Sequence, residues 1–176
     1  MVNLESHTFF VRARLAFATL LAASVLSLSV AFYLQIFQNL PPCMLCQYQR
    51  LPYFAVTGIA FLGFLITGNN THHRIACILL VFCVFAFLTG SAMALFHLGV
   101  ENTWWGATSG CKGMGFQDTN LKDLKDAIMN APIANCSDVL WRYLGVSLAG
   151  WNLIWSLFLT LVTGLVAANW IYNNRR

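Results

Sequence analysis

Four cysteines, arranged as two pairs, have the types and spacing for redox chemistry. Cys43 and Cys46 form a Cys-x-x-Cys pair at the end of an apolar segment, and Cys111 and Cys136 lie in a long polar stretch. A Cys-x-x-Cys pair can close a disulfide within one helical turn, and two further thiols on a loop can reach it. Such an arrangement beside a bilayer suits thiol–disulfide exchange coupled to a membrane-soluble electron carrier.

Thiol–disulfide exchange needs an attacking thiolate and a leaving thiol of low pKa. If a helix begins near Cys46, its dipole and free N–H groups favour a thiolate there, and Arg50 follows one turn later with a fixed positive charge. Pro52 disfavours helical geometry at Leu51. The helix is therefore either kinked at this point or begins only at Pro52.

Other interpretations of the cysteines remain open. A Cys₄ zinc site could use all four thiols, although the wide second pair lacks the tight second knuckle of a zinc ribbon. The disulfides could also be purely structural staples of outer loops. A thioredoxin fold is excluded, because no βαβ pattern surrounds the Cys-x-x-Cys pair. Cys77 and Cys83 lie inside an apolar run and are expected to pack as small apolar side chains.

The composition predicts a membrane protein. Of the 176 residues, 59% are hydrophobic and 9% are charged, against roughly 25% charged in an average soluble domain. A helix needs about 20 apolar residues to cross the hydrocarbon of a bilayer. The apolar runs that approach or reach this length are residues 15–37, 46–67, 75–98 and 148–171.

These runs predict an all-α, integral membrane four-helix bundle that forms a single membrane domain over residues 1–176. The first run is longer than the roughly 7–15 residues of a signal-peptide core, so we interpret it as a span. A small transporter is disfavoured, because the spans lack the acidic or basic residues that such proteins use for coupling.

Four spans place both termini on one side of the membrane and the loops at about 38–50 and 99–147 on the other. Lys and Arg residues close to the spans favour cytoplasmic termini. Disulfide chemistry persists in the periplasm and not in the cytosol, which favours the same orientation. Residues 121–129 alternate apolar and charged faces at helical spacing and predict a short amphipathic helix on the bilayer surface.

Tyr and Trp residues gather near the predicted span ends, where such rings prefer the headgroup level. We interpret them as interfacial anchors and assign none a catalytic role. They are Tyr48, Tyr53, Trp104, Trp105, Trp141, Tyr143, Trp151, Trp170 and Tyr172.

Three stretches of sequence resemble one known family. Residues 42–50 read Pro-Cys-Met-Leu-Cys-Gln-Tyr-Gln-Arg, and residues 96–101 and 141–145 precede and follow the loop cysteines. With the four spans, they resemble the DsbB family of bacterial inner-membrane disulfide oxidoreductases. The related vitamin K epoxide reductase family places its Cys-x-x-Cys pair after the loop pair, whereas here it comes first.

The resemblance implies an electron relay. The Cys111–Cys136 disulfide would accept electrons from a reduced periplasmic DsbA-like protein of thioredoxin fold, with Cys111 forming the mixed disulfide. Cys136 would then exchange with Cys43, and the reducing equivalents would reach the Cys43–Cys46 pair. Cys46 would face a membrane quinone, ubiquinone or menaquinone, which leaves as quinol.

The resemblance also implies roles for two further side chains. Arg50 matches an arginine that supports the quinone step, and His97 matches a histidine near the quinone pocket. His97 could equally be an interfacial residue that hydrogen-bonds headgroups or backbone. The expected partners are the DsbA-like protein, the quinone and the lipid bilayer, without nucleic acid or a metal ion. The alternative function is a non-catalytic membrane protein with structural loop disulfides.

Overall fold

The computed structural model describes residues 2–67, 73–106, 111 and 134–173, and the side chains of residues 12–67, 74–106, 111 and 134–172. Its long helices are α1 (Val2–Phe37), α3 (Leu51–Ile66), α4 (His73–Glu101) and α6 (Leu148–Asn173). Within the described residues, four helical segments are long and apolar enough to cross a membrane. They confirm the predicted all-α, four-helix class. The amphipathic helix expected at 121–129 lies outside the described residues.

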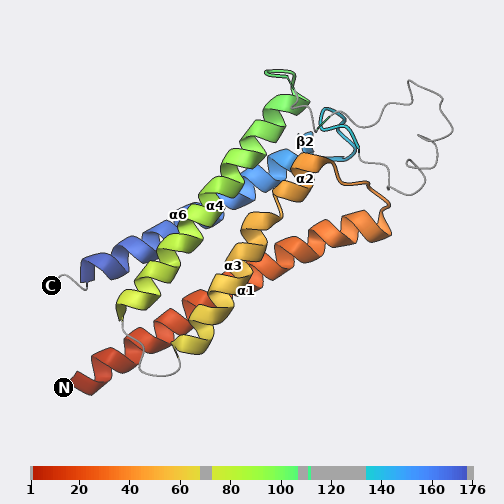
Figure 1. Ribbon diagram of the computed structural model, residues 1–176. Coiled ribbons are helices and arrows are strands. Elements are labelled where there is room, and N and C mark those ends of the chain that lie inside the picture. Colours follow the sequence, from red (N-terminus) through yellow and green to blue (C-terminus); the bar gives the residue numbers. More distant parts are fainter. Residues whose placement is uncertain (1, 68–72, 107–110, 112–133, 174–176) are drawn as a thin grey trace, which may run out of the picture.

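The four long helices pack in sequence order. α1 packs against α3, α3 against α4, and α4 most extensively against α6. The start of α1 and the end of α6 lie at one end of the bundle (Figure 1). The other end carries the short helix α2 (Met44–Tyr48), the end of α4 and the start of α6. The segments that bear the four cysteines of interest therefore meet at one end of the molecule.

Small side chains let the helices approach closely. A Cβ atom on Gly63 of α3 would lie 2.6 Å from the ring of Phe17 on α1, so the contact requires glycine. Between α4 and α6, the buried Ser91 hydroxyl donates to the Ser156 hydroxyl across 3.0 Å. Small residues and inter-helix hydrogen bonds of this kind are typical of helices that associate within a bilayer.

The outward faces of the helices are apolar. Large hydrophobic side chains stay exposed along every long helix, where water would be a poor solvent for them and lipid a good one. Examples with about half or more of their surface exposed are Leu26, Phe61, Phe82, Phe85, Leu161 and Leu165.

The second membrane segment is two helices rather than one. α2 begins at Met44, and Cys43 is its N-cap, with an extended backbone and a sulfur that accepts from the Cys46 N–H at 3.1 Å. The chain then turns, and α3 begins at Leu51 with Pro52 in its first turn. Pro52 has no N–H to bond the carbonyl four residues earlier, so a continuous helix is interrupted there. We had expected the helix to begin at Cys46, but Cys46 lies inside the first turn of α2, which begins at Met44.

A short hairpin precedes α6 and was not anticipated by the all-helical prediction. Strand β1 (Arg142–Tyr143) pairs antiparallel with β2 (Val146–Ser147). The two turn residues, Leu144 and Gly145, have φ angles of 52° and 80°, as a two-residue type I′ turn requires. Ser147 then caps α6, because its hydroxyl accepts from the Gly150 N–H at 3.2 Å.

Candidate redox site

The Cys-x-x-Cys pair is a closely spaced pair of thiols. The sulfur atoms of Cys43 and Cys46 lie 2.7 Å apart, and neither cysteine is in a disulfide. Cys43 is buried, whereas Cys46 is partly exposed. The hydrogen bond to the Cys46 sulfur and then burial raise the pKa of the Cys43 thiol well above its usual range, although backbone N–H groups oppose this. Cys43 is therefore the member of the pair that keeps its proton.

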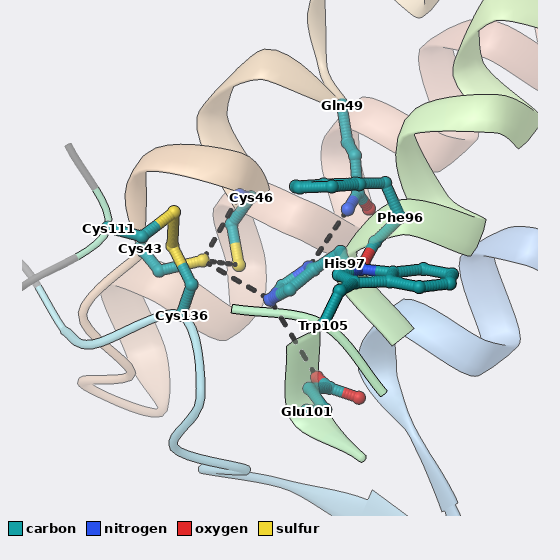
Figure 2. Close-up of a disulfide and its surroundings, with 9 residues drawn as sticks. All are labelled: Cys43, Cys46, Gln49, Phe96, His97, Glu101, Trp105, Cys111 and Cys136. Carbon is teal, nitrogen blue, oxygen red and sulfur yellow. Dashed lines mark hydrogen bonds and ion pairs between the residues drawn. A yellow bond between two sulfur atoms is a disulfide. The ribbon is translucent and has the colours of Figure 1, made fainter. Parts of the chain in front are cut away.

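The second pair of cysteines is bonded and lies beside the first. Cys111 and Cys136 form a disulfide with a Cα–Cα distance of 5.2 Å, and both are buried. The Cys136 N–H donates to the Cys111 carbonyl at 3.3 Å. Both cysteines share one buried cluster with Cys43 and Val100, and Cys46 packs against it (Figure 2). The fold thus gathers the four predicted cysteines, and bonded sulfurs cannot serve as thiolates of a Cys₄ zinc site.

His97, near the end of α4, contacts the Cys-x-x-Cys pair directly. Its Nε2 atom lies 3.6 Å from the Cys43 sulfur and 3.8 Å from a carboxylate oxygen of Glu101. Its Nδ1 atom lies 2.9 Å from the Gln49 side-chain nitrogen. Figure 2 shows the ring between Cys43, Gln49 and Glu101. Because His97 is buried, its ring contacts protein groups rather than lipid headgroups.

Arg50 lies in the break between α2 and α3. Its guanidinium donates to the Gln35 side-chain oxygen at 2.7 Å and lies 4.8 Å from the centroid of the Phe32 ring, so α1 holds it in place. Its charge interacts with the sulfurs of Cys46 and Cys43. Cys46 and Arg50 do not lie on one continuous helix, because α2 ends at Tyr48 and α3 begins at Leu51. A fixed positive charge still lies beside the thiols.

An apolar cavity of about 370 Å³ adjoins the site, between α1, the α2–α3 segment and α6. Cys46, Arg50 and His97 all line it, whereas Cys43 does not. Most of the remaining wall is apolar. The further lining residues are Leu26, Ser27, Leu28, Val30, Ala31, Leu34, Gln49, Tyr53, Leu148, Ala149, Trp151, Asn152 and Trp155.

The family model described as Disulfide bond formation protein DsbB matches residues 13–166, which include all four cysteines of the site. The chain belongs to the DsbB family. With four helical segments that are long and apolar enough to cross a membrane among its described residues, it is a multi-pass membrane protein of the disulfide bond formation family.

Individual relatives carry the DsbB family name. A Disulfide bond formation protein B of Xylella fastidiosa (strain Temecula1) is 32% identical over 142 residues, covering 79% of this chain and 80% of the relative. The protein of that name from Nitrosospira multiformis is 31% identical, covering 76% and 78%. The one from Pasteurella multocida is 26% identical, covering 87% and 84%.

Beyond the residues expected from the DsbB resemblance, the structure adds polar side chains that the sequence analysis missed. Tyr53 is buried and donates to the Asn152 side chain at 2.7 Å, so its interpretation as an interfacial anchor was wrong. Asn152 in turn donates to Gln49 at 2.7 Å. A polar residue within an apolar run, as Asn152 is, was the available signal, because such residues are costly in a membrane and commonly have partners.

Proposed function

We propose that this protein is a membrane thiol–disulfide oxidoreductase that reoxidises a periplasmic DsbA-like dithiol oxidase and passes the electrons to ubiquinone or menaquinone. One observation supports this most strongly. A buried loop disulfide, Cys111–Cys136, packs on the Cys43 thiol, and the adjacent Cys46 thiol lines an apolar cavity. A disulfide, a dithiol and an apolar pocket in series are the parts of an electron path from protein thiols to a lipid-soluble acceptor.

The first step takes electrons from the partner. A thiolate of the reduced DsbA-like protein attacks Cys111, the Cys111–Cys136 bond breaks, and Cys136 leaves as a thiolate. The partner's second thiol then displaces Cys111, so the partner closes its own disulfide. Two electrons pass to the loop pair, and the partner's two protons are released or rebound by the loop thiols.

The second step moves the electrons from the loop pair to the Cys43–Cys46 pair. The Cys136 thiolate attacks Cys43 within a Cys43–Cys46 disulfide, and Cys46 leaves as a thiolate beside the Arg50 charge. Cys111 then attacks Cys136, which reforms the loop disulfide and releases Cys43. The product has a bonded loop pair and two Cys-x-x-Cys thiols, which is the pairing described above. Packing of Cys43 and Cys136 in one cluster supports this exchange.

The residues of the cavity fit a quinone. Its volume of about 370 Å³ lies within the roughly 300–1,000 Å³ typical of ligand pockets, and its apolar wall between α1 and α6 suits an isoprenoid-bearing ring. Arg50 and His97 supply polar groups at the Cys46 end. A bound quinone would take up the two electrons and two protons that the dithiol loses on closing to a disulfide. Arg50 stabilises negative charge on Cys46 during that step.

We also propose the cellular placement. The protein lies in the bacterial inner membrane as a single membrane domain with both termini cytoplasmic, and both cysteine pairs face the periplasm. The start of α1 and the end of α6 lie opposite the cysteine-bearing end of the bundle, which supports this topology (Figure 1). Periplasmic cysteines would meet their partner in an oxidising compartment.

The proposal is tested by replacing Cys46. The variant Cys46→Ser should lose quinone reduction by reduced DsbA-like protein while the Cys111–Cys136 disulfide still forms. Cys77→Ser is the matched control, because Cys77 packs beside the bundle core away from the site. Quinol formation is followed by absorbance in detergent-solubilised protein. Near-normal quinol formation by Cys46→Ser would overturn the role of Cys46. Absence of quinol formation by the unsubstituted protein would favour the non-catalytic alternative, in which the disulfide only staples the loops.

A further inference from the structure

A chain of three hydrogen bonds links α3 and α6 to the ring of His97. The Tyr53 hydroxyl donates to the Asn152 side-chain oxygen at 2.7 Å, and the Asn152 side-chain nitrogen donates to the Gln49 oxygen at 2.7 Å. The Gln49 nitrogen lies 2.9 Å from His97 Nδ1. We call Tyr53, Asn152 and Gln49 the amide chain.

The amide chain has a direction. Each amide accepts at its oxygen and donates at its nitrogen, so the orientation of one fixes that of the next. At the far end, the Tyr53 hydroxyl is buried, and in the described part of the chain Asn152 is its acceptor. A buried donor left without an acceptor is costly. Asn152 must therefore accept from Tyr53, and Gln49 must donate to His97 Nδ1.

The groups around the other ring nitrogen of His97, Nε2, favour the same placement of the ring proton. Nε2 faces the Cys43 sulfur and a Glu101 oxygen. The other Glu101 oxygen accepts from the Ser147 hydroxyl, as an ionised carboxylate can. A carboxylate oxygen and a sulfur beside Nε2 favour a proton on that nitrogen. The amide chain at Nδ1 and the two groups at Nε2 therefore favour the same tautomer independently of each other.

We propose that Gln49, Asn152 and Tyr53 are positioning residues that hold neutral His97 in the Nε2–H tautomer, so that the ring donates a hydrogen bond to the Cys43 sulfur. In this tautomer His97 cannot act as a base toward Cys43, because Nε2 already carries its proton and the lone pair lies on Nδ1.

The catalytic consequence rests on the proposed function. When Cys111 attacks Cys136, the Cys43–Cys136 bond breaks and its electron pair goes to the Cys43 sulfur. The Nε2–H group faces that sulfur and stabilises the charge without giving up its proton. A hydrogen bond to an ionised group is stronger than one to a neutral group, so the leaving thiolate benefits more than the starting disulfide. His97 thereby favours release of Cys43 over the reverse exchange.

The tautomer can be measured directly by nitrogen NMR of detergent-solubilised protein labelled with ¹⁵N-histidine, at a pH where the ring is neutral. The protonated and unprotonated ring nitrogens have widely separated chemical shifts, and the His97→Gln variant identifies the signals that belong to this ring. We expect Nδ1 to be unprotonated and Nε2 to carry the proton. A wild-type ring protonated on Nδ1 would overturn the proposal.

Two substitutions on different helices should reverse the tautomer. In Asn152→Asp both side-chain oxygens accept, so the Gln49 nitrogen turns toward residue 152 and its oxygen faces Nδ1. In Gln49→Glu the carboxylate accepts from Asn152 and from Nδ1–H. Both variants should move the proton to Nδ1. Thr160→Val on α6, which removes only a hydrogen bond to the Ser156 carbonyl, should leave it on Nε2. Retention of Nε2–H in both acidic variants contradicts the proposal.

The proposed effect of His97 on the release of Cys43 is tested by the rate at which electrons pass from the loop pair to the Cys43–Cys46 pair. Reduced partner is mixed with protein in which both cysteine pairs have first been oxidised to disulfides, the reaction is quenched with acid, and trapped Cys43 and Cys46 thiols are quantified by mass spectrometry. Asn152→Asp should slow their appearance about 10-fold, which corresponds to about 1.4 kcal/mol, while Thr160→Val should not. An unchanged rate in a variant whose tautomer has reversed would disprove the assigned role. Absence of any exchange in the wild type would instead contradict the proposed function and leave the tautomer result standing.

Discussion

At the scale of single residues, the two thiols of the Cys-x-x-Cys pair lie in different surroundings. Cys43 is the N-cap of α2, is buried, and faces His97 and the loop disulfide. Cys46 is partly exposed and lines the apolar cavity with Arg50. The pair thus has one member on the side of the loop disulfide and one on the side of the cavity. This asymmetry suits a dithiol that exchanges with protein sulfur on one side and a lipid-soluble acceptor on the other.

The raised pKa of Cys43 predicts slow alkylation of this thiol. A thiol whose pKa is raised has a smaller thiolate fraction at a given pH, and only the thiolate reacts readily. In protein with a reduced Cys-x-x-Cys pair, Cys43 should remain unmodified by iodoacetamide through the pH range in which ordinary thiols, with a pKa of about 8.5, become reactive. Peptide mass spectrometry after timed alkylation measures this. Reaction of Cys43 at the rate of an exposed cysteine would show that neither burial nor the Cys46 contact controls it.

The position of Arg50 predicts that its substitutions weaken quinone binding to different degrees. Arg50→Met removes the charge beside the sulfurs and should raise the apparent KM for quinone about 10-fold or more, the factor that about 1.4 kcal/mol represents. Arg50→Lys should rescue only part of this loss, because lysine keeps the charge but lacks the planar fork that bonds Gln35. Steady-state quinone titration compares the three proteins. Equal KM values would show that Arg50 only anchors the α2–α3 break to α1 and does not contribute to quinone binding.

The sequence predicted the residues with unusual chemistry and missed those that orient them. Cysteine spacing and the Arg50 charge were sufficient to identify the first group. Tyr53 was misassigned because an aromatic residue near a span end has the same sequence signature whether it faces headgroups or the protein. Gln49 contacts His97, and Asn152 contacts Gln49, only because the α2–α3 segment packs with α4 and α6, which no local pattern encodes.

At the scale of elements, the break between α2 and α3 sets the geometry of the site. Pro52 indicated a disturbance, but sequence alone did not decide between a kink and a new helix. The N-cap at Cys43 decides it, because capping starts a separate single turn before the proline. The chain therefore turns at Gln49 and Arg50, and both side chains lie beside the cysteines. Length and hydropathy predicted the four long helices well because bilayer thickness fixes both quantities.

The close contact between α1 and α3 predicts opposite effects of two glycine substitutions. Gly63→Ala should lower the thermal unfolding temperature, because its Cβ would overlap the Phe17 ring, and overpacking costs about 1–3 kcal/mol. Gly58→Ala, on the same helix, is the matched control, since nothing lies within 4 Å of the added Cβ. It should leave stability unchanged or slightly raised, because alanine favours helix. Thermal unfolding in detergent compares them, and equal midpoints would contradict this packing.

At the scale of the whole molecule, the bundle brings three separate parts of the chain to one end. The Cys-x-x-Cys turn, the end of α4 with His97, and the segment around Cys136 meet there (Figures 1 and 2). The apolar cavity opens beside them between α1 and α6. The proposed electron path therefore runs from the loop disulfide, which would exchange with the partner protein, to the apolar cavity, which would hold the quinone. It requires no large movement of the long helices.

The central claim is that electrons enter at the loop disulfide and leave through the Cys-x-x-Cys pair. The most direct test is trapping of the mixed disulfide with purified, oxidised DsbA-like partner, whose own disulfide can exchange with a free loop thiol, followed by acid quenching and non-reducing gels. In Cys136→Ser the free Cys111 thiolate attacks the partner's disulfide, which is the reverse of the proposed first step. The cross-link between Cys111 and the partner should accumulate, because the Cys136 thiol that would displace the partner is absent. Cys77→Ser should accumulate none. If neither Cys136→Ser nor Cys111→Ser yields a cross-link, the loop pair is structural and the account is contradicted.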